Sequence, residues 1–454
     1  MILLVALVGV VAIVSLSFLN WRRAVKTVLF VVVLEGVLRK WVLPQASDMI
    51  YFLKDLILLG AYLRYYLSPE PKYPLKLTFF NIALLMSLGW CIFQVVNPNL
   101  GSLIVGIFGL KAYLFYVPLM WMLPSLFDSE EELYKFLRAY LLLLIPVSIL
   151  AIAQFYSPAS SPINVYGGGV EANAVVDGNP RVTGTFPYIA GYSTYLSICW
   201  TILIPLMSLP HKKIWSFLTL VEILLIVGTS FMTGARGLLL FEILFTLGYF
   251  CLLWLTKPSK AFNATKQFVV PILLISTVVP LFFDKAIQAF SKRATTASDS
   301  STFVDRVFSS FTAPQQAMQH KGFDSYGIGA THQAISTLRK TLKLPLGESP
   351  PPSEGEMGRI VLEIGPIGFI IWYGLRLILI FSLLGVFLKL KTPFLRNLAL
   401  AAFLLHAINL TNQLVFNNTL GIYYWFFSGF IFLLPELEYR QSLSYRHQVQ
   451  QHYV

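Results

Sequence analysis

Arginines at the ends of apolar segments are the residues of this sequence whose chemistry is easiest to predict. Arg181 and Arg236 each stand shortly before an apolar run, Arg306 lies within a long polar segment, and Arg359 begins the apolar run after that segment. A guanidinium group is planar, stays charged at any workable pH and binds phosphate oxygens through paired hydrogen bonds. Such groups at the mouth of a membrane protein suit a polyanion, and we expect a lipid-linked phosphate or pyrophosphate.

A second set of charged residues lies within or at the ends of apolar runs, where a bilayer makes charge costly. These residues are Glu35, Arg39, Lys54, Asp55 and Lys111. Glu35 and Arg39 are four residues apart, so they can pair on one helix face. Structural pairing and substrate contact are both open for Glu35–Arg39 and for Lys54–Asp55. Other ionisable residues are expected to make structural contacts inside the protein: Glu222, Glu242 and His406.

The composition is typical of a protein that crosses a membrane several times. Of its 454 residues, 56% are hydrophobic and 12% are charged, which is too apolar for a soluble globular protein. Runs of about 20 apolar residues can cross a bilayer as helices. We predict an all-α polytopic membrane protein with twelve or thirteen spans in a single membrane domain, residues 1–454. The predicted spans are Ile2–Leu19, Ala24–Leu38, Met49–Leu67, Lys76–Val96, Leu103–Leu126, Leu133–Tyr156, Tyr188–Leu209, Trp215–Met232, Gly237–Leu255, Phe268–Phe283, Gly358–Leu388, Phe394–Gln413 and Leu420–Pro435.

The distribution of basic residues predicts the orientation. The formal net charge is +12, but most basic residues lie in short loops between spans, which is the usual cytoplasmic bias and does not indicate a nucleic-acid partner. Residues 157–187 and 284–357 then form two loops on the outer face, and the second is expected to be helical over Ala286–Ala294 and Ser301–Ala317. Arg39 and Lys40 are an exception, because they fall on the outer face against the bias.

Three short motifs occur in order around the large loop. Arg181-Val182-Thr183-Gly184-Thr185-Phe186-Pro187 leads into a span, and Thr233-Gly234-Ala235-Arg236-Gly237 forms a turn between two spans. Glu354-x-Glu356-x-x-Arg359 then leads into Glu363-x-Gly365-x-x-Gly368. Together with the loop, these motifs resemble the O-antigen ligase and O-antigen polymerase family, membrane glycosyltransferases that act on lipid-linked glycans at the outer face of the bacterial inner membrane.

The resemblance implies a GT-C-like helical fold, an undecaprenyl-diphosphate-linked glycan as donor, a glycan acceptor, and neither a metal ion nor another cofactor. The large loop would then be periplasmic. By the same resemblance Arg181, Arg236 and Arg306 bind pyrophosphate, and we add Arg359 to this set. Ligases of this family carry a histidine about nine residues before the Glu of the E-x-G-x-x-G stretch, as the base that activates the acceptor hydroxyl. The corresponding residue here is Glu354, which favours a polymerase over a ligase.

A carboxylate can take the place of that histidine if burial raises its pKa. Glu356 and His332 are the nearest alternatives to Glu354 as the base, and His332 is also a candidate for substrate contact. Glu354 and Glu356 have a second interpretation, because carboxylates favour the N-terminal end of a helix. The glycines after Glu363 are expected to allow close helix packing.

Two other functions remain open. A transporter or flippase of lipid-linked sugars would also expose arginines, although such proteins usually contain repeated halves, and none are visible here. An O-antigen ligase-type enzyme would transfer the glycan to a lipid or protein acceptor instead of extending a polymer. For a polymerase, we expect membrane lipid and chain-length regulator or export proteins as further partners.

Overall fold

The computed structural model shows a bundle of α-helices and describes residues 2–69, 72–73, 78–171, 174–176, 178–208, 213–295, 303–353 and 355–452. Within these residues the only sheet is an antiparallel pair, β1 (Val175–Val176) and β2 (Asn179–Pro180). The α-helices are α1 (Ile2–Leu19), α2 (Trp21–Val37), α3 (Ser47–Ile50), α4 (Leu53–Leu67), α5 (Phe79–Val95), α6 (Leu103–Leu114), α7 (Leu119–Leu126), α8 (Glu130–Leu142), α9 (Leu144–Tyr156), α10 (Ile189–Met207), α11 (Lys213–Thr233), α12 (Arg236–Thr256), α13 (Pro258–Thr295), α14 (Phe303–Lys321), α15 (Ile335–Leu342), α16 (Glu356–Lys389), α17 (Pro393–Ile408), α18 (Asn418–Ser428) and α19 (Phe430–His452).

Eight helices of the described residues are long and apolar enough to cross a membrane, or nine if the pair α6 and α7, bent by 41°, forms one span. This finding supports a helical multi-pass membrane protein, and fewer helices meet the length and composition of a span than the twelve or thirteen predicted. All the predicted spans overlap helices, but α2 and α4 have only 17 and 15 residues. Both are shorter than the roughly 20 residues that a bilayer requires, and both carry several charges.

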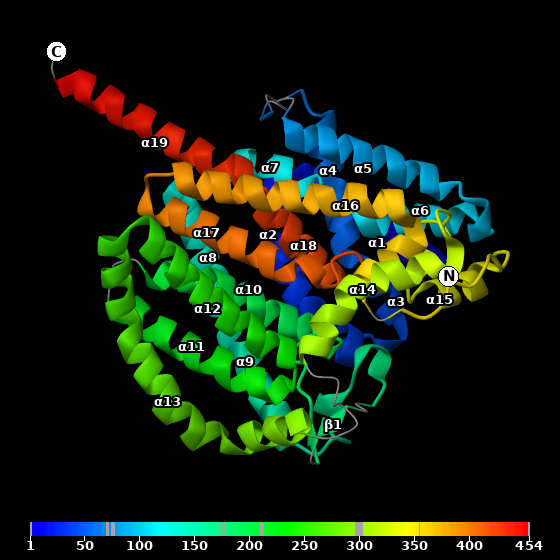
Figure 1. Ribbon diagram of the computed structural model, residues 1–454, viewed down its shortest axis with the longest axis horizontal. Helices are drawn as coiled ribbons and strands as arrows, with labels where there is room; N and C mark the ends of the chain where they lie inside the picture. The colour runs from blue at the N-terminus through cyan, green and yellow to red at the C-terminus, as the bar shows by residue number, and fades with distance from the viewer. Residues whose placement is uncertain are drawn as a thin grey trace.

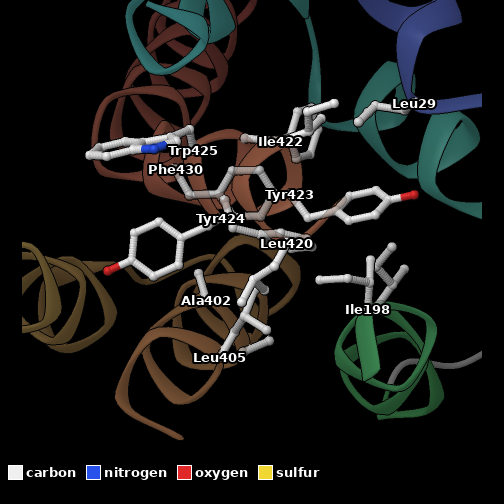
Figure 2. Packing of buried hydrophobic residues seen from close by; sticks show 14 of the residues in the cluster. Leu29, Ile198, Ala402, Leu405, Leu420, Ile422, Tyr423, Tyr424, Trp425 and Phe430 are labelled. Carbon is white, nitrogen blue, oxygen red and sulfur yellow. The ribbon is translucent and has the colours of Figure 1, made fainter. Parts of the chain in front are cut away.

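The centre of the bundle is the short helix α18, in which nearly every residue is buried. Figure 2 shows Tyr423, Tyr424 and Trp425 of α18 spreading outward between neighbouring helices, with Leu405 of α17 and Ile198 of α10 beside them. Close packing of this kind holds helices together where lipid removes much of the hydrophobic driving force. The core therefore fixes how the surrounding helices approach one another.

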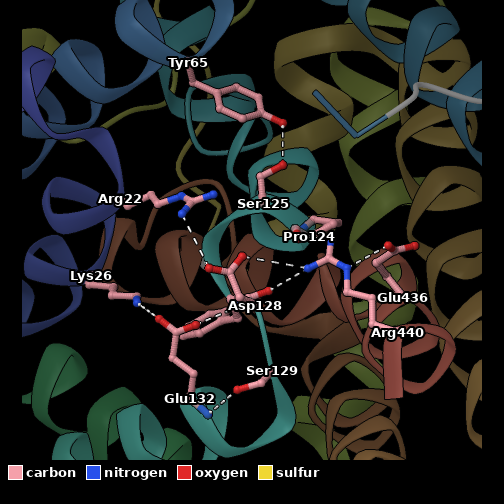
Figure 3. Close-up of polar contacts among 11 residues, drawn as sticks. Arg22, Lys26, Tyr65, Pro124, Ser125, Asp128, Ser129, Glu132, Glu436 and Arg440 are labelled. Carbon is pink, nitrogen blue, oxygen red and sulfur yellow. Dashed lines mark hydrogen bonds and ion pairs between the residues drawn. The ribbon is translucent and has the colours of Figure 1, made fainter. Parts of the chain in front are cut away.

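The two ends of the bundle differ. The helices α14 and α15 and the β-strands lie at one end, and the last part of α19 projects from the other (Figure 1). Figure 3 shows the polar network near the beginning of α2, where Lys26 contacts Glu132 at 2.6 Å and Asp128 lies 3.6 Å from Arg22 and 4.0 Å from Arg440. The opposite end, where α2 finishes, is called the mouth below.

The segment predicted as the large outer loop is folded and docked on the mouth. Its first part continues α13, which runs through an irregular residue, Phe283, to Thr295. The predicted helix Ala286–Ala294 is thus confirmed by α13, and the predicted helix Ser301–Ala317 is confirmed by α14 from Phe303 onward, because its first two residues lie outside the described residues. The helix α14 packs along α16. After α14, a Cβ on Gly329 would lie 2.7 Å from Cα of Gly109 in α6. Only glycine allows this approach, so the loop backbone lies directly on α6.

Candidate functional site

Five charged residues predicted from the sequence meet at the mouth, on α2, α4, α6 and the π-helical turn η1 (Leu38–Val42). We call Glu35, Arg39, Lys54, Asp55 and Lys111 the mouth cluster. Lys54 Nζ donates to both carboxylate oxygens of Glu35, at 2.9 and 2.8 Å. Arg39 lies 3.6 Å from Glu35, and Lys111 lies 2.7 Å from Asp55. The predicted Glu35–Arg39 pairing is therefore confirmed, whereas Lys54 and Asp55 pair with other helices rather than with each other.

The mouth cluster carries more positive than negative charge. It contains three cations and two carboxylates, and each carboxylate already has a cationic partner. All three cations also lie near the aromatic ring of Tyr51. The distance from the ring centre is 5.5 Å for Arg39, 4.8 Å for Lys54 and 5.2 Å for Lys111. Buried charge is costly unless it is compensated. The surplus positive charge therefore favours an anion at this end of the bundle.

Lys40 adds a further buried cation, which was not among the predicted site residues. Its Nζ donates to Thr183 Oγ1 at 2.7 Å and to the Gly184 carbonyl at 3.0 Å. Only 2% of Lys40 is exposed. The signal that could have identified it is its predicted place on the outer face, against the charge bias. Lys40 fixes the motif that begins at Arg181 to the end of α2.

Arg181 lies at a second position, beside the turn between α11 and α12. Its Nε donates to the Thr233 carbonyl at 2.8 Å, and Arg293 Nη1 donates to the Gly234 carbonyl at 2.6 Å. Gly234 has a φ of 62°, and a Cβ there would lie 3.0 Å from Arg293 and 3.2 Å from Arg181. Arg236, the first residue of α12, is half-buried two residues after this glycine. The structure thus places Arg181, Arg236 and Arg293 around one turn.

Arg359, near the beginning of α16, lines an open cavity of about 510 Å³ whose other lining residues belong to the docked segment, and we call this cavity the loop pocket. Its Nε donates to Thr331 Oγ1 at 3.1 Å, and its Nη2 donates to the Thr331 carbonyl at 2.6 Å. The guanidinium carbon lies 3.4 Å from the ring centre of Phe416. The other lining residues are Ala330, Thr331, His332, Gln333, Ile335, Ser336, Arg339, Leu346, Gly347, Glu348, Ser349, Pro350, Pro351, Pro352 and Ser353.

His332 connects the loop pocket with the mouth cluster. Its ring lies 4.8 Å from that of Phe108, which precedes Lys111 by three residues on α6. Burial, together with the nearby charges of Lys111 and Arg359, lowers the pKa of His332 to about 4. Its Nδ1 accepts the Ala334 N–H at 3.1 Å, so the neutral ring carries its proton on Nε2. His332 therefore offers a donor at neutral pH.

The Glu363-x-Gly365-x-x-Gly368 motif positions the wall of this pocket. Glu363 Oε1 accepts the backbone N–H of Thr331 at 2.8 Å and its hydroxyl at 2.7 Å, and the same Thr331 holds Arg359. Gly365, with a φ of 72°, breaks α16. A Cβ on Gly368 would lie 2.4 Å from Trp90 Nε1. Close packing of the glycines is as expected, and Glu363 has the additional role of orienting the loop.

Glu356 does not line the loop pocket. Its Oε1 lies 2.7 Å from Arg376 Nη1, its Oε2 accepts the Val415 N–H at 3.0 Å, and both charged side chains are 1% exposed. Glu356 also occupies the first turn of α16, as the alternative interpretation of this carboxylate predicts. Glu354 lies outside the described residues. Arg306 falls on α14, but its side chain lies outside the described part of the structure.

The remaining predicted polar contacts are structural. Arg138 Nη1 lies 2.9 Å from Glu222, and Ser230 donates to Glu242 at 2.6 Å, so both carboxylates join neighbouring helices. His406 is held between the Ala402 carbonyl and Ser428, at 2.7 and 2.9 Å. These contacts confirm the expected roles.

The described residues contain no group of three or more His, Cys, Asp or Glu side chains that could hold a metal ion. Neither a scan against protein-family models nor a search of curated proteins gives a match for this chain.

Proposed function

We propose that this protein is a membrane glycosyltransferase that transfers a glycan from undecaprenyl diphosphate to an acceptor sugar, extending a polysaccharide. In this proposal it acts in the bacterial inner membrane, with the mouth on the periplasmic side. The observation that carries the proposal is the surplus of cations at the mouth, together with an open cavity whose lining residue His332 contacts α6 through Phe108. Arg359 lines that cavity and has no carboxylate within 4.0 Å among the described residues.

The chemistry of glycan transfer requires this kind of electrostatics. As the acceptor oxygen bonds to the anomeric carbon, the bond from that carbon to the diphosphate oxygen breaks, and the diphosphate leaves with added negative charge. Fixed cations stabilise that charge more in the transition state than in the ground state. Arg359 and Lys111 are best placed for this role, because His332 lies close to both.

Direct displacement inverts the configuration at the anomeric carbon and releases a proton from the acceptor hydroxyl. Glu354 remains our candidate for the base that takes this proton. The preceding residue, Ser353, lines the loop pocket. His332 is less suited to this task, since its Nδ1 is engaged by the backbone and its Nε2 bears the proton. It can instead donate to an oxygen of the diphosphate or of a sugar.

The test uses purified protein in liposomes, supplied with a lipid-linked oligosaccharide, with product length read on a gel. We expect Arg359→Ala, Arg181→Ala and Arg236→Ala to lower chain extension at least about a hundredfold while the protein stays folded. The matched control is Lys135→Ala, because Lys135 is also cationic but its side chain is 70% exposed on α8.

Unchanged polymer length in all three arginine variants would refute the role of these cations. Movement of the lipid-linked substrate across the bilayer, with no new glycosidic bond, would instead establish a transporter. Glycan found on a lipid or protein acceptor, without lengthening, would establish a ligase.

A further inference from the structure

A second arginine of the loop pocket, Arg339, has no assigned partner of opposite charge. It belongs to α15, and its Nη2 and Nη1 donate to the carbonyls of Leu100 at 2.9 Å and Pro345 at 3.1 Å. Its Nε is buried and has no hydrogen-bond partner, and no carboxylate lies within 4.0 Å among the described residues. The backbone contacts fix the position of this guanidinium without neutralising its charge.

Only one carboxylate of the described residues lines the pocket, and it is already paired. Glu348 lies 2.6 Å from Lys321, whose pKa is raised by this hydrogen bond. The cavity thus contains two guanidiniums, those of Arg339 and Arg359, and no unpaired anion of the described residues. A ligand that occupies it should carry negative charge.

The rest of the lining suits a sugar. Gln333, Ser336 and Ser349 supply amide and hydroxyl groups that can bond sugar hydroxyls, and the run Pro350–Pro352 supplies apolar surface for a ring face. A cavity of about 510 Å³ falls within the range of about 300–1,000 Å³ that small-molecule sites occupy. The pocket therefore combines sugar-type contacts with positive charge.

The two arginines occupy different electrostatic settings. Arg359 and Lys111 of the mouth cluster both act on His332, since the charge of each lowers the pKa of that histidine, and two such cations suit the high charge of a diphosphate. Arg339 belongs to α15 on the wall formed by the docked segment, and no residue of the mouth cluster lines the pocket. One fixed guanidinium matches one carboxylate in charge and geometry.

We infer that the loop pocket binds an acidic glycan and that Arg339 binds the carboxylate of a uronic acid residue in it. This inference rests on the proposed function and names the substrate class of the same site. Arg339 then acts in specificity: it selects a carboxylate-bearing repeat over its neutral counterpart. Removal of such a charged hydrogen bond is expected to weaken binding about tenfold or more.

The test measures binding by calorimetry, with the full-length protein in detergent and without donor or turnover. The probes are a hexuronate oligosaccharide and the same oligosaccharide with its carboxyl groups reduced to alcohols. We expect the wild type to bind the acidic form at least about tenfold more tightly, and Arg339→Gln to bind both forms equally. Arg339→Lys keeps the charge and should retain part of the preference. Lys340→Gln removes a neighbouring exposed charge outside the pocket and should change nothing.

Equal binding of the two forms by the wild type, or an unchanged preference in Arg339→Gln, would overturn the inference. Inorganic pyrophosphate provides the second arm: if Arg339→Gln weakens pyrophosphate binding and leaves hexuronate binding intact, Arg339 belongs to the donor site instead. Selective hexuronate binding by a protein that forms no glycosidic bond would support the carboxylate site and refute the proposed transfer reaction. The two proposals therefore fail in different ways.

Discussion

Variants of the ion pair Glu356–Arg376 can show whether the Glu356 carboxylate has a structural or a catalytic role. Sequence reasoning gave Glu356 two roles, a base for the acceptor hydroxyl or a residue of the helix start. In the structure both of its oxygens are engaged inside the bundle, by Arg376 and by the Val415 N–H. We therefore expect Glu356 to stabilise the junction between α16 and the segment before α18, and not to take a proton from substrate.

The size of the effect follows from burial. Both side chains are 1% exposed, and removal of one partner from a buried ion pair leaves an uncompensated charge at a cost of about 3–5 kcal/mol. Glu356→Gln and Arg376→Gln should each destabilise the protein by roughly this amount. In the double variant no buried charge is left without its partner, and the amide at position 356 can still accept the Val415 N–H, although the bond of Arg376 Nη2 to the Asn409 carbonyl is lost. We expect the double variant to recover about 2–3 kcal/mol relative to the sum of the single variants.

The assay is equilibrium unfolding in mixed detergent micelles for all four proteins, together with chain extension at a temperature where each is folded. A structural role predicts energetic coupling and restored activity in the double variant. Additive free energies of unfolding would refute the pairing. A double variant that is stable but inactive would refute the structural assignment and establish Glu356 as the base.

Two further predictions concern the mouth. Gly36→Ala should lower the free energy of unfolding by about 1–3 kcal/mol, because its Cβ would lie 2.1 Å from the Thr185 carbonyl oxygen; Gly374→Ala, with nothing within 4 Å, is the control and should not destabilise. The pKa of His332 falls from 6.5 to about 4 on folding. The unfolded chain therefore binds the extra proton in that window, and stability should decrease as the pH falls from 6.5 to 4. His332→Gln should lessen this decrease in pH-dependent unfolding curves, and an identical curve would contradict the burial of His332.

The sequence shows which charged residues lie within apolar runs, but it does not show which of them form ion pairs with one another. Glu35 and Arg39 lie on one helix, so their spacing alone gives the pair. Lys54 and Asp55 are adjacent in sequence, yet helix geometry points them in different directions, and they reach Glu35 on α2 and Lys111 on α6. Such pairs depend on how helices pack, which hydrophobic periodicity does not encode.

Fewer helices of the described residues meet the length and composition of a span than the sequence predicted, for a related reason. Hydropathy marks an apolar run wherever most residues are apolar, and it takes little account of helix length. In α4, Lys54 and Asp55 are buried against other helices, so charge is hidden inside the bundle rather than excluded from it. The break in α16 was signalled by Gly365 and Pro366. The orientation of Thr331 by Glu363 could not be predicted in the same way, because it depends on how the docked segment packs against α16.

The structure also separates the arginines that the sequence grouped together. Arg359 lines the loop pocket, whereas Arg181 lines a much smaller hollow beside Gly234 together with Arg293. Arg181 begins the motif whose Thr183 holds Lys40, so it can act on the mouth through that backbone without contacting the donor.

Different kinetic defects should follow from this separation. Arg359→Ala should weaken the binding of undecaprenyl diphosphate, because it removes a cation from the cavity wall. Arg181→Ala should slow chain extension with little change in that binding, because it loosens the segment that positions Lys40. Binding measured with labelled undecaprenyl diphosphate, beside turnover for both variants, tests this difference. If Arg181→Ala weakens binding as much as Arg359→Ala does, the two guanidiniums share one diphosphate, and the hollow beside Gly234 must open toward the loop pocket when the donor binds.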